Sequence, residues 1–294
     1  MKPIHYAALL LLGSIWGASF LFIGLAVHEF GPLLLMFLRV LGAGLVLVGL
    51  AQWRQRQQKS ETGLNWRTNW RTYLVVGLLN SALPFTLIAF SELSITASLA
   101  AVLNSTTPLF AVLIAAVWRN EPLTRRKLLG GFLGVVGVSI LTGGGPLAVN
   151  AELIVAVLAS LAAALCYGAG TVYAAKNLKG LTPIYASIAQ LLSAAVLLAI
   201  PAVLAIPTTM PSPTAIIALL ALTLLSTSFA YLLYFFLLQN VGSTRTASVT
   251  FLVPVFGTIW GIAFLQDPFN LGMLLGMGVI LASVGLVTGG QPRP

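Results

Sequence analysis

The stretch AVLNSTTPLF at residues 101–110 has a counterpart, ASVTFLVPVF, at residues 247–256. At an offset of 146 residues the two share an alanine, a proline and a phenylalanine in register: Ala101 with Ala247, Pro108 with Pro254, and Phe110 with Phe256. A proline inside an apolar segment removes a backbone hydrogen bond and bends a helix, so its repetition at one register position is informative. The match predicts an internal duplication.

The match extends beyond this stretch. Glu121-Pro122 pairs with Asp267-Pro268 at the same offset. At an offset of 151 the beginnings of the two halves also pair: Trp16-Gly17-Ala18 with Tyr167-Gly168-Ala169, and Arg39 with Gln190. We expect two units, residues 1–145 and 146–294. A duplication retained only for packing is the alternative.

The composition places both units in a membrane. The 294 residues are 59% hydrophobic and 7% charged, and the mean hydropathy is +1.00. Soluble domains carry about 25% charged residues, and a bilayer-spanning helix needs about 20 apolar residues. The apolar runs are continuous rather than alternating, which excludes a transmembrane β-barrel. Ten segments are predicted, which leaves no room for a soluble catalytic domain: 4–27, 32–53, 73–93, 95–118, 127–143, 151–175, 183–206, 214–238, 244–265 and 270–288.

Each unit therefore contains five segments. Because five is odd, the second unit is inverted in the bilayer relative to the first. Inverted repeats are typical of secondary transporters, in which the two halves rock around a midplane site and expose it alternately to each side. The fold class expected is an all-α integral membrane protein, with ten transmembrane helices around a central cavity.

The distribution of basic residues predicts the orientation. If the N-terminus is cytoplasmic, all but one of the 15 Lys and Arg residues lie on the cytoplasmic side: Lys2, Arg54, Arg56, Lys59, Arg67, Arg71, Arg119, Arg125, Arg126, Lys127, Lys176, Lys179, Arg245 and Arg293. The outer ends carry only the acids Glu29, Glu92, Glu152 and Asp267. This bias follows the positive-inside rule. We expect both termini in the cytoplasm of a bacterium and the chain in its inner membrane.

These features resemble the EamA-type branch of the drug/metabolite transporter superfamily. The resemblance rests on Trp16-Gly17, on Arg39, on the stretch from Ala97 through Pro108 to Glu121-Pro122, and on its second copy from Ala247 to Asp267-Pro268, where Asp replaces the usual Glu. It implies ten helices in two inverted halves around a central cavity. Several relatives export amino acids, and the YddG type exports aromatic ones. The resemblance does not fix the substrate.

Charged groups inside the segments are scarce. No Asp or Glu lies deep within a predicted span, so facilitated export is expected over proton antiport, which needs a buried carboxylate. The alternative is a proton-coupled or exchange carrier for other neutral metabolites or organic cations, served by an acid at a segment end. Arg39 is the one basic residue inside a span. It either contacts a substrate carboxylate or forms part of a gate, or it is a structural residue tied to Glu92, Glu29 or helix-end carbonyls.

Polar and aromatic side chains near the span centres are the cavity candidates. An aromatic wall with hydroxyls and amides suits an amino acid with an aromatic or large apolar side chain. The substrate-binding candidates are Trp16, Asn80, Phe85, Thr86, Phe90, Asn104, Tyr167, Ser228, Tyr231, Tyr234 and Thr250. The hinge or gating candidates are Pro84, Pro108, Pro254 and Arg39.

Other classes of protein fit less well. A membrane enzyme would need a carboxylate, His or Cys constellation inside the spans, and none is present in the sequence. A receptor or scaffold would be expected to carry a partner domain. We expect no catalytic residue, metal or cofactor, no nucleic acid partner, and a monomer in the lipid bilayer with a small-molecule substrate.

Overall fold

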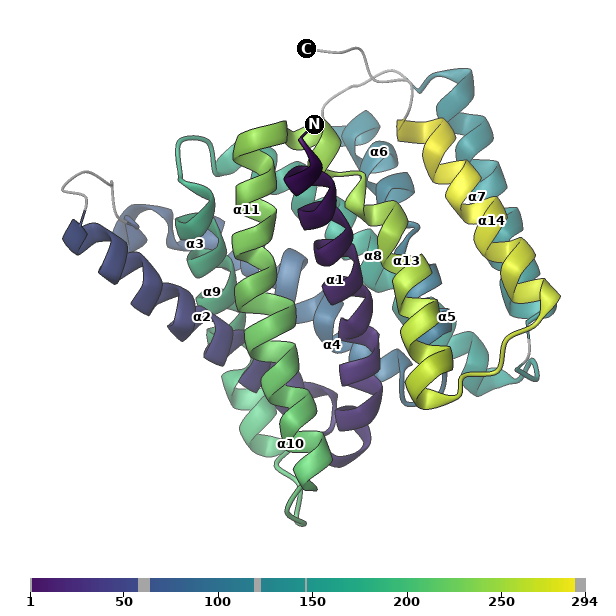
Figure 1. Cartoon of the computed structure of the whole chain (residues 1–294), viewed down its shortest axis with the longest axis horizontal. Helices are drawn as coiled ribbons and strands as arrows, with labels where there is room; N and C mark the ends of the chain where they lie inside the picture. The colour runs from purple at the N-terminus through teal and green to yellow at the C-terminus, as the bar shows by residue number, and fades with distance from the viewer. Residues whose placement is uncertain (1, 58–63, 119–122, 146, 289–294) are drawn as a thin grey trace.

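The computed structural model describes residues 2–57, 64–118, 123–145 and 147–288 and is all-helical over those ranges (Figure 1). Four charged residues of the sequence predictions lie outside the described residues: Lys59, Arg119, Glu121 and Arg293. Within the described ranges, nine helical segments are long and apolar enough to cross a membrane, and a tenth, Val249–Leu265, is shorter but apolar. The prediction of a ten-helix membrane fold is confirmed.

The helices follow the predicted order, although several are interrupted. Their bounds are α1 Pro3–Phe30, α2 Pro32–Gln57, α3 Trp66–Gly77, η1 Leu78–Ala82, α4 Leu83–Ser91, α5 Ala97–Asn104, α6 Thr107–Trp118, α7 Arg125–Gly143, α8 Ala151–Asn177, α9 Pro183–Leu204, α10 Pro213–Leu220, η2 Ala221–Phe229, α11 Ala230–Val241, α12 Ser243–Thr246, α13 Val249–Trp260, η3 Gly261–Leu265 and α14 Leu271–Thr288. The third span begins at Trp66, earlier than the predicted 73, because a polar first turn precedes its apolar part.

Local chemistry sets the helix ends. Gly31 ends α1 with φ of 72°, a left-handed value that favours glycine, and α2 begins at the next residue, Pro32. Proline is tolerated there because the first helical N–H has no partner within the helix. At the start of α8 the Asn150 side chain accepts a hydrogen bond from the Leu153 N–H at 2.8 Å, a common N-cap.

Within the described ranges, three spans contain π-helical segments: η1 in the third, η2 in the eighth and η3 in the ninth. Wider turns free backbone carbonyls, and hydroxyl side chains occupy two of them in η2. Thr227 Oγ1 donates to the Leu222 carbonyl at 2.8 Å, and Ser228 Oγ donates to the Thr223 carbonyl at 3.0 Å. Single π-helical turns often mark functional sites.

The fourth span is broken at residues 105–106, between α5 and α6. Ser105 Oγ donates to the Val102 carbonyl at 2.6 Å and Thr106 Oγ1 to the Leu103 carbonyl at 2.7 Å, so side chains satisfy the backbone where the helix stops. Pro108 is thus the second residue of α6, and Pro84 is the second residue of α4. Pro108 follows the break directly, where proline is accepted in a first turn, whereas Pro84 follows the π-helical turn η1 within the continuous helical span Trp66–Ser91. Pro254 does lie inside a helix, α13.

Helices from the two halves of the sequence pack on each other. α1 packs on α13, and α8 packs on α5 and α6. Glycine allows the close approach in both places. A Cβ on Gly17 would lie 2.7 Å from the Gly257 backbone nitrogen, and a Cβ on Gly168 would lie 2.7 Å from the Ala111 backbone nitrogen. These contacts pair positions that the sequence offsets of 151 and 146 relate to each other.

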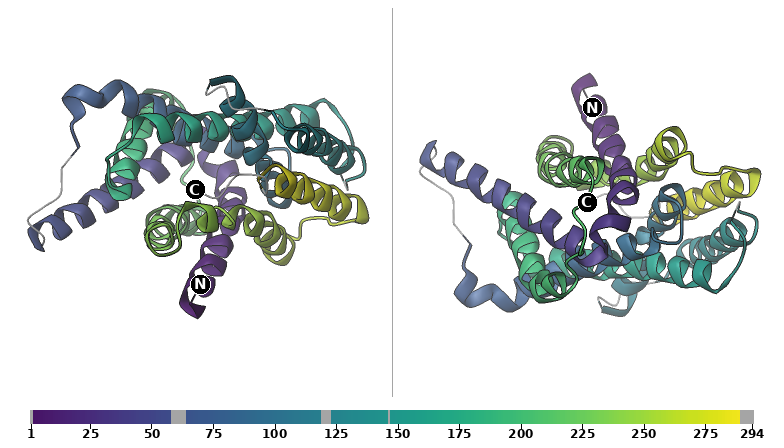
Figure 2. Two further views of the ribbon diagram at one scale, coloured as in Figure 1. Left: turned by 90° about the horizontal axis from the view of Figure 1, so that it is seen from above. Right: turned by 90° about the horizontal axis from the view of Figure 1, so that it is seen from below.

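The remaining spans pair across the molecule. α2 packs on α9, and α7 packs on α14 at one edge of the bundle, opposite α2 (Figures 1 and 2). α1 begins and α14 ends at the same end of the bundle (Figure 1). We call this the basic end, because it holds the first turn of α7 with Arg125 and Arg126. The opposite end holds Glu29 and Asp267, and we call it the acidic end.

Candidate functional site

Arg39 lies on α2 in the interior of the bundle and is 6% exposed. Its Nε donates to Thr227 Oγ1 of η2 at 3.0 Å, and its guanidinium carbon lies 3.9 Å from the centre of the Phe85 ring on α4. The ring face attracts the cation, a contact worth about 2 kcal/mol when desolvated. Within the described ranges Arg39 has no carboxylate at ion-pair distance, and its other contact is with Met36 Sδ.

Arg39 is not tied to Glu29 or Glu92 within the described ranges, and its hydrogen-bond partner is a hydroxyl. Glu29 instead accepts hydrogen bonds from the Ser212 backbone N–H and from Ser212 Oγ, the latter at 2.7 Å. A guanidinium has five N–H donors, and a buried cation is costly unless an anion or further acceptors meet it. Arg39 therefore has donor capacity for a bound anion.

Gln190, the repeat counterpart of Arg39, lies in the same region. Its Nε2 donates to Ser81 Oγ of η1 at 2.8 Å and to Tyr231 Oη of α11 at 3.0 Å, with the Asn80 carbonyl at 3.4 Å. One amide from α9 thereby links a helix of the first unit to one of the second.

Aromatic rings border these polar groups in three contacting pairs. The ring centres are 6.2 Å apart for Phe85 and Tyr167, 6.0 Å for Tyr231 and Phe235, and 5.7 Å for Trp16 and Tyr234. The first pair is edge-on and the second is stacked, both favourable geometries. We define the central cluster as Arg39, Asn80, Ser81, Phe85, Tyr167, Gln190, Thr227 and Tyr231.

The central cluster draws on both units and lies inside the bundle. Arg39 and Gln190 each lie seven residues past the first residue of their helix, Pro32 and Pro183 respectively. At about 1.5 Å per residue this is about 10 Å from the helix start. Since α2 starts at the acidic end and α9 at the basic end, the two side chains approach the middle from opposite ends.

The structure brings together five of the sequence candidates directly: Asn80, Phe85, Tyr167, Tyr231 and Arg39, with Trp16 and Tyr234 packed beside them. The Ser228 hydroxyl is used within η2. Thr86 Oγ1 and Asn104 Oδ1 are buried without a hydrogen-bond partner among the described residues. Phe90 lies apart and is 44% exposed, and Thr250 Oγ1 bonds to the Ala247 carbonyl of its own helical turn.

Three members of the central cluster were missed by the sequence analysis: Ser81, Gln190 and Thr227. The repeat alignment of Gln190 with Arg39 was a usable signal for Gln190. Ser81 and Thr227 gave no comparable signal, because their roles depend on the π-helical turns.

Glu92 follows the last residue of α4 at the acidic end, as the sequence indicates, but it is buried. It is 4% exposed, and neither carboxylate oxygen has a hydrogen-bond partner in the part of the chain that the structure describes. Asp267 is 9% exposed and accepts a hydrogen bond from the Ser98 N–H at 2.8 Å. The expectation of facilitated export rested on the absence of an interior carboxylate, and the burial of Glu92 removes that ground.

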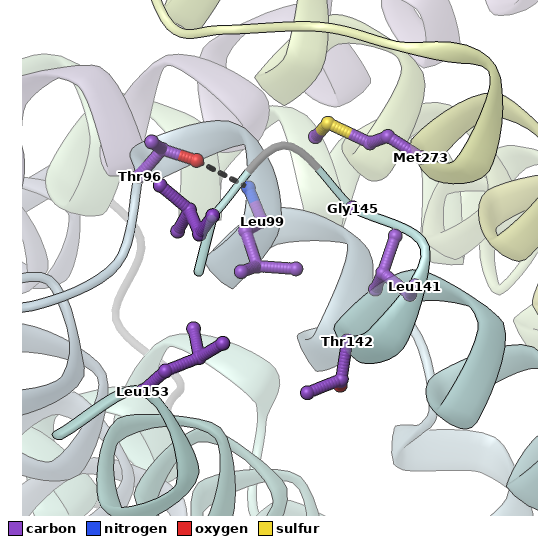
Figure 3. Close-up of a pocket in the computed structure, with 8 residues that line it drawn as sticks. Thr96, Leu99, Leu141, Thr142, Gly145, Leu153 and Met273 are labelled. Atoms are coloured by element: carbon purple, nitrogen blue, oxygen red, sulfur yellow. Dashed lines mark hydrogen bonds between the residues drawn. The ribbon is translucent and has the colours of Figure 1, made fainter. Parts of the chain in front are cut away.

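A small cavity also lies at the acidic end (Figure 3). Its volume is about 10 Å³, close to the space that one water molecule requires. Thr96, Leu99, Leu141, Thr142, Gly145, Leu147, Leu153 and Met273 line it. It is too small for an amino acid, and none of its lining residues belongs to the central cluster.

The chemistry of the central cluster suits binding rather than bond breaking. It offers one cation, neutral amide and hydroxyl groups, and aromatic faces. Among the residues that the structure describes, no three His, Cys, Asp or Glu side chains meet in a group that could hold a metal ion. The molecule is a multi-pass α-helical membrane protein with a cluster of polar side chains in a largely apolar interior.

Comparison with known proteins identifies its family. The sequence model of the EamA-like transporter family matches residues 4–143 and 154–289, and the chain belongs to this family. It is 29% identical to the "Uncharacterized transporter YvbV" of Bacillus subtilis, over 97% of this chain and 92% of that protein. It is 26% identical to the "Uncharacterized inner membrane transporter YedA" of Escherichia coli, over 97% and 91%.

A solved crystal structure shares the fold. It matches with a TM-score of 0.63 at 17% identity and covers 97% of this chain and 96% of the other. The chain is therefore a membrane transporter of the EamA-like family.

Proposed function

We propose that this transporter exports small zwitterionic metabolites, above all amino acids with aromatic or large apolar side chains, and that the central cluster is its substrate site. One observation carries the proposal: Arg39 is a buried cation with no carboxylate partner in the described structure, and it lies against an aromatic ring. A substrate carboxylate would supply the missing anion, and charge-assisted hydrogen bonds of this kind are among the strongest in proteins.

The walls of the site favour the same substrate class. Phe85, Tyr167 and Tyr231 present rings that can stack on an apolar or aromatic side chain. A multiply charged phosphate ester would call for further basic groups, and Arg39 is the only Lys or Arg that lies more than two residues from the ends of a predicted span. A neutral or zwitterionic solute leaves no excess charge in the interior.

Alternating access between two inverted units is the proposed mechanism. Three observations support it. The family model matches the chain over 4–143 and 154–289, close to the proposed units. The contacts of Gly17 and Gly168 are related by the repeat offsets, and the central cluster combines side chains from both units. The break before Pro108 and the proline inside α13 are the proposed hinges, because backbone there is already released from regular helix bonding.

The proposed orientation places the basic end in the bacterial cytoplasm, with both termini there and the chain a monomer in the inner membrane. The charge bias of the sequence supports it. The printed name of the Escherichia coli relative, an inner membrane transporter, supports the location.

Counterflow in proteoliposomes tests the function. Vesicles loaded with unlabelled phenylalanine should take up labelled Phe, Trp or Leu faster than Ala or Thr, and empty liposomes should not. Movement of a neutral sugar or an organic cation, with no amino acid moved, would refute the substrate class. No counterflow of any solute on the panel would refute the proposal as a whole.

A further inference from the structure

We infer that Glu92 is a proton-binding site of the transport cycle and that the protein exchanges its substrate for a proton. The direction of this exchange rests on the proposed export function, but the assignment of Glu92 as a proton-binding site does not. The side chain is almost fully buried and both oxygens lack a hydrogen-bond partner within the described ranges. A carboxylate that is ionised and unpartnered in such a place is costly by several kcal/mol. A bound proton removes that cost.

Part of the surroundings of Glu92 is apolar. Oε2 lies 3.5 Å from where a Cβ on Gly24 of α1 would be, and Leu265 Cδ1 and Ala97 Cβ lie within 4.0 Å of the same point. These neighbours supply no donor to a carboxylate. A side chain larger than that of Gly24 would begin to fill the space that Glu92 occupies.

Two charged groups act on Glu92 from a distance. Asp267, after η3, carries the same charge as an ionised Glu92, and Arg39, on α2, carries the opposite charge. The Asp267 carboxylate is already held by the Ser98 N–H and lies beside Gly261, so it does not share a hydrogen bond with Glu92. Arg39 is not within ion-pair distance in the described structure, and its contacts are Thr227, Met36 and the Phe85 ring. The proton is therefore the smallest partner that neutralises Glu92.

The position of Glu92 can couple the proton to transport. Its environment is built from α4 and α1 of the first unit and from Leu265 and Asp267 of the second. A rocking motion of the units changes these contacts and admits water, and the hydrated carboxyl then releases its proton: Glu92–COOH becomes Glu92–COO⁻ plus a proton accepted by water. Protons that enter the cell down their gradient drive substrate out only if the two move in opposite directions, which gives exchange.

The proton site is tested without substrate. Purified protein in lipid at neutral pH should show the infrared carbonyl band of a protonated carboxylic acid. The band should vanish in Glu92→Gln and persist in Glu152→Gln, the matched control, since Glu152 is an exposed acid at the same end. Absence of the band from the unmodified protein at neutral pH would overturn the inference. Loss of the band on addition of Na⁺ or K⁺ would also overturn it and identify a metal-cation site instead.

Coupling is tested by transport. With an imposed gradient of one pH unit and the membrane potential held at zero, exchange of one proton per amino acid predicts an about tenfold accumulation ratio on the acidic side. Glu92→Gln should retain Phe–Phe counterflow, in which no net proton moves, and lose the response to the gradient, while Glu152→Gln behaves like the unmodified protein. An unaltered gradient response in Glu92→Gln, or accumulation on the alkaline side, would overturn exchange at Glu92. Absence of counterflow in the unmodified protein would instead refute the proposed function.

Discussion

Replacing Arg39 by glutamine is the sharpest perturbation of the proposed site. The change gives α2 the residue that α9 carries at Gln190, so the new side chain is one the interior already accommodates. It removes the charge, the hydrogen bond to Thr227 and the contact with the Phe85 ring. If the guanidinium binds a substrate carboxylate, the loss is that of a hydrogen bond to a charged group, about 1.5–3 kcal/mol. The dissociation constant for phenylalanine should rise roughly 10- to 150-fold.

The assay is isothermal titration calorimetry on purified protein, with phenylalanine and with phenylethylamine, which lacks the carboxylate. Arg39→Gln should weaken phenylalanine binding and leave phenylethylamine binding almost unchanged. Arg39→Lys should give an intermediate value, because it keeps the charge but loses the planar fork that matches a carboxylate. Arg54→Gln is the control, since Arg54 lies on the same helix, exposed near the basic end.

Two results would refute the reasoning. Phenylalanine binding that is unchanged in Arg39→Gln would show that the guanidinium does not meet the substrate. An equal loss for both ligands would show that Arg39 shapes the site without contacting the carboxylate. The thermal unfolding midpoint of each variant, measured alongside, separates either outcome from misfolding.

Further predictions concern the walls, the packing and the orientation. Tyr231→Ala should slow transport of Phe more than that of Ala in competition uptake, since stacking contributes about 0.5–1.5 kcal/mol, and equal slowing would argue against the stacking role. Gly168→Val should destabilise the protein by about 1–3 kcal/mol in thermal unfolding, because the added methyls meet the α6 backbone, whereas Gly278→Ala, which faces open space, should be neutral. In intact cells a cysteine at Thr209 should react with an impermeant thiol reagent and one at Gln57 should not; the reverse pattern would invert the topology.

Much of the fold could be predicted from the sequence because hydrophobic length alone defines membrane spans. The interruptions within these helices could not be predicted in this way. The break after Asn104 depends on Ser105 and Thr106 turning their hydroxyls back onto the backbone, and the π-helical turns have no hydropathy signature. Three hydroxyl residues precede Pro108, but serine and threonine also occur inside regular helices of this chain, so the run alone does not predict the break.

The site was predicted in part. Aromatic residues and Arg39 could be selected because such groups are conspicuous in apolar segments. The partners of Arg39 could not, since a hydroxyl on η2 and a ring on α4 meet it only through tertiary packing. The burial of Glu92 could not be predicted either, because the sequence places it at the end of a span and only tertiary packing covers it.

Arg39 and Gln190 occupy matching depths measured from opposite ends of the bundle, yet only one of them is charged. A fully symmetric interior would accept a zwitterion equally well in two head-to-tail poses. A single off-centre guanidinium lowers the energy of one pose, with the carboxyl group toward α2 and the side chain toward the rings of α8 and α11. In the proposed alternating-access cycle the bound substrate then keeps one orientation, whichever side of the carrier is open. The inward and outward openings therefore face different ends of the substrate.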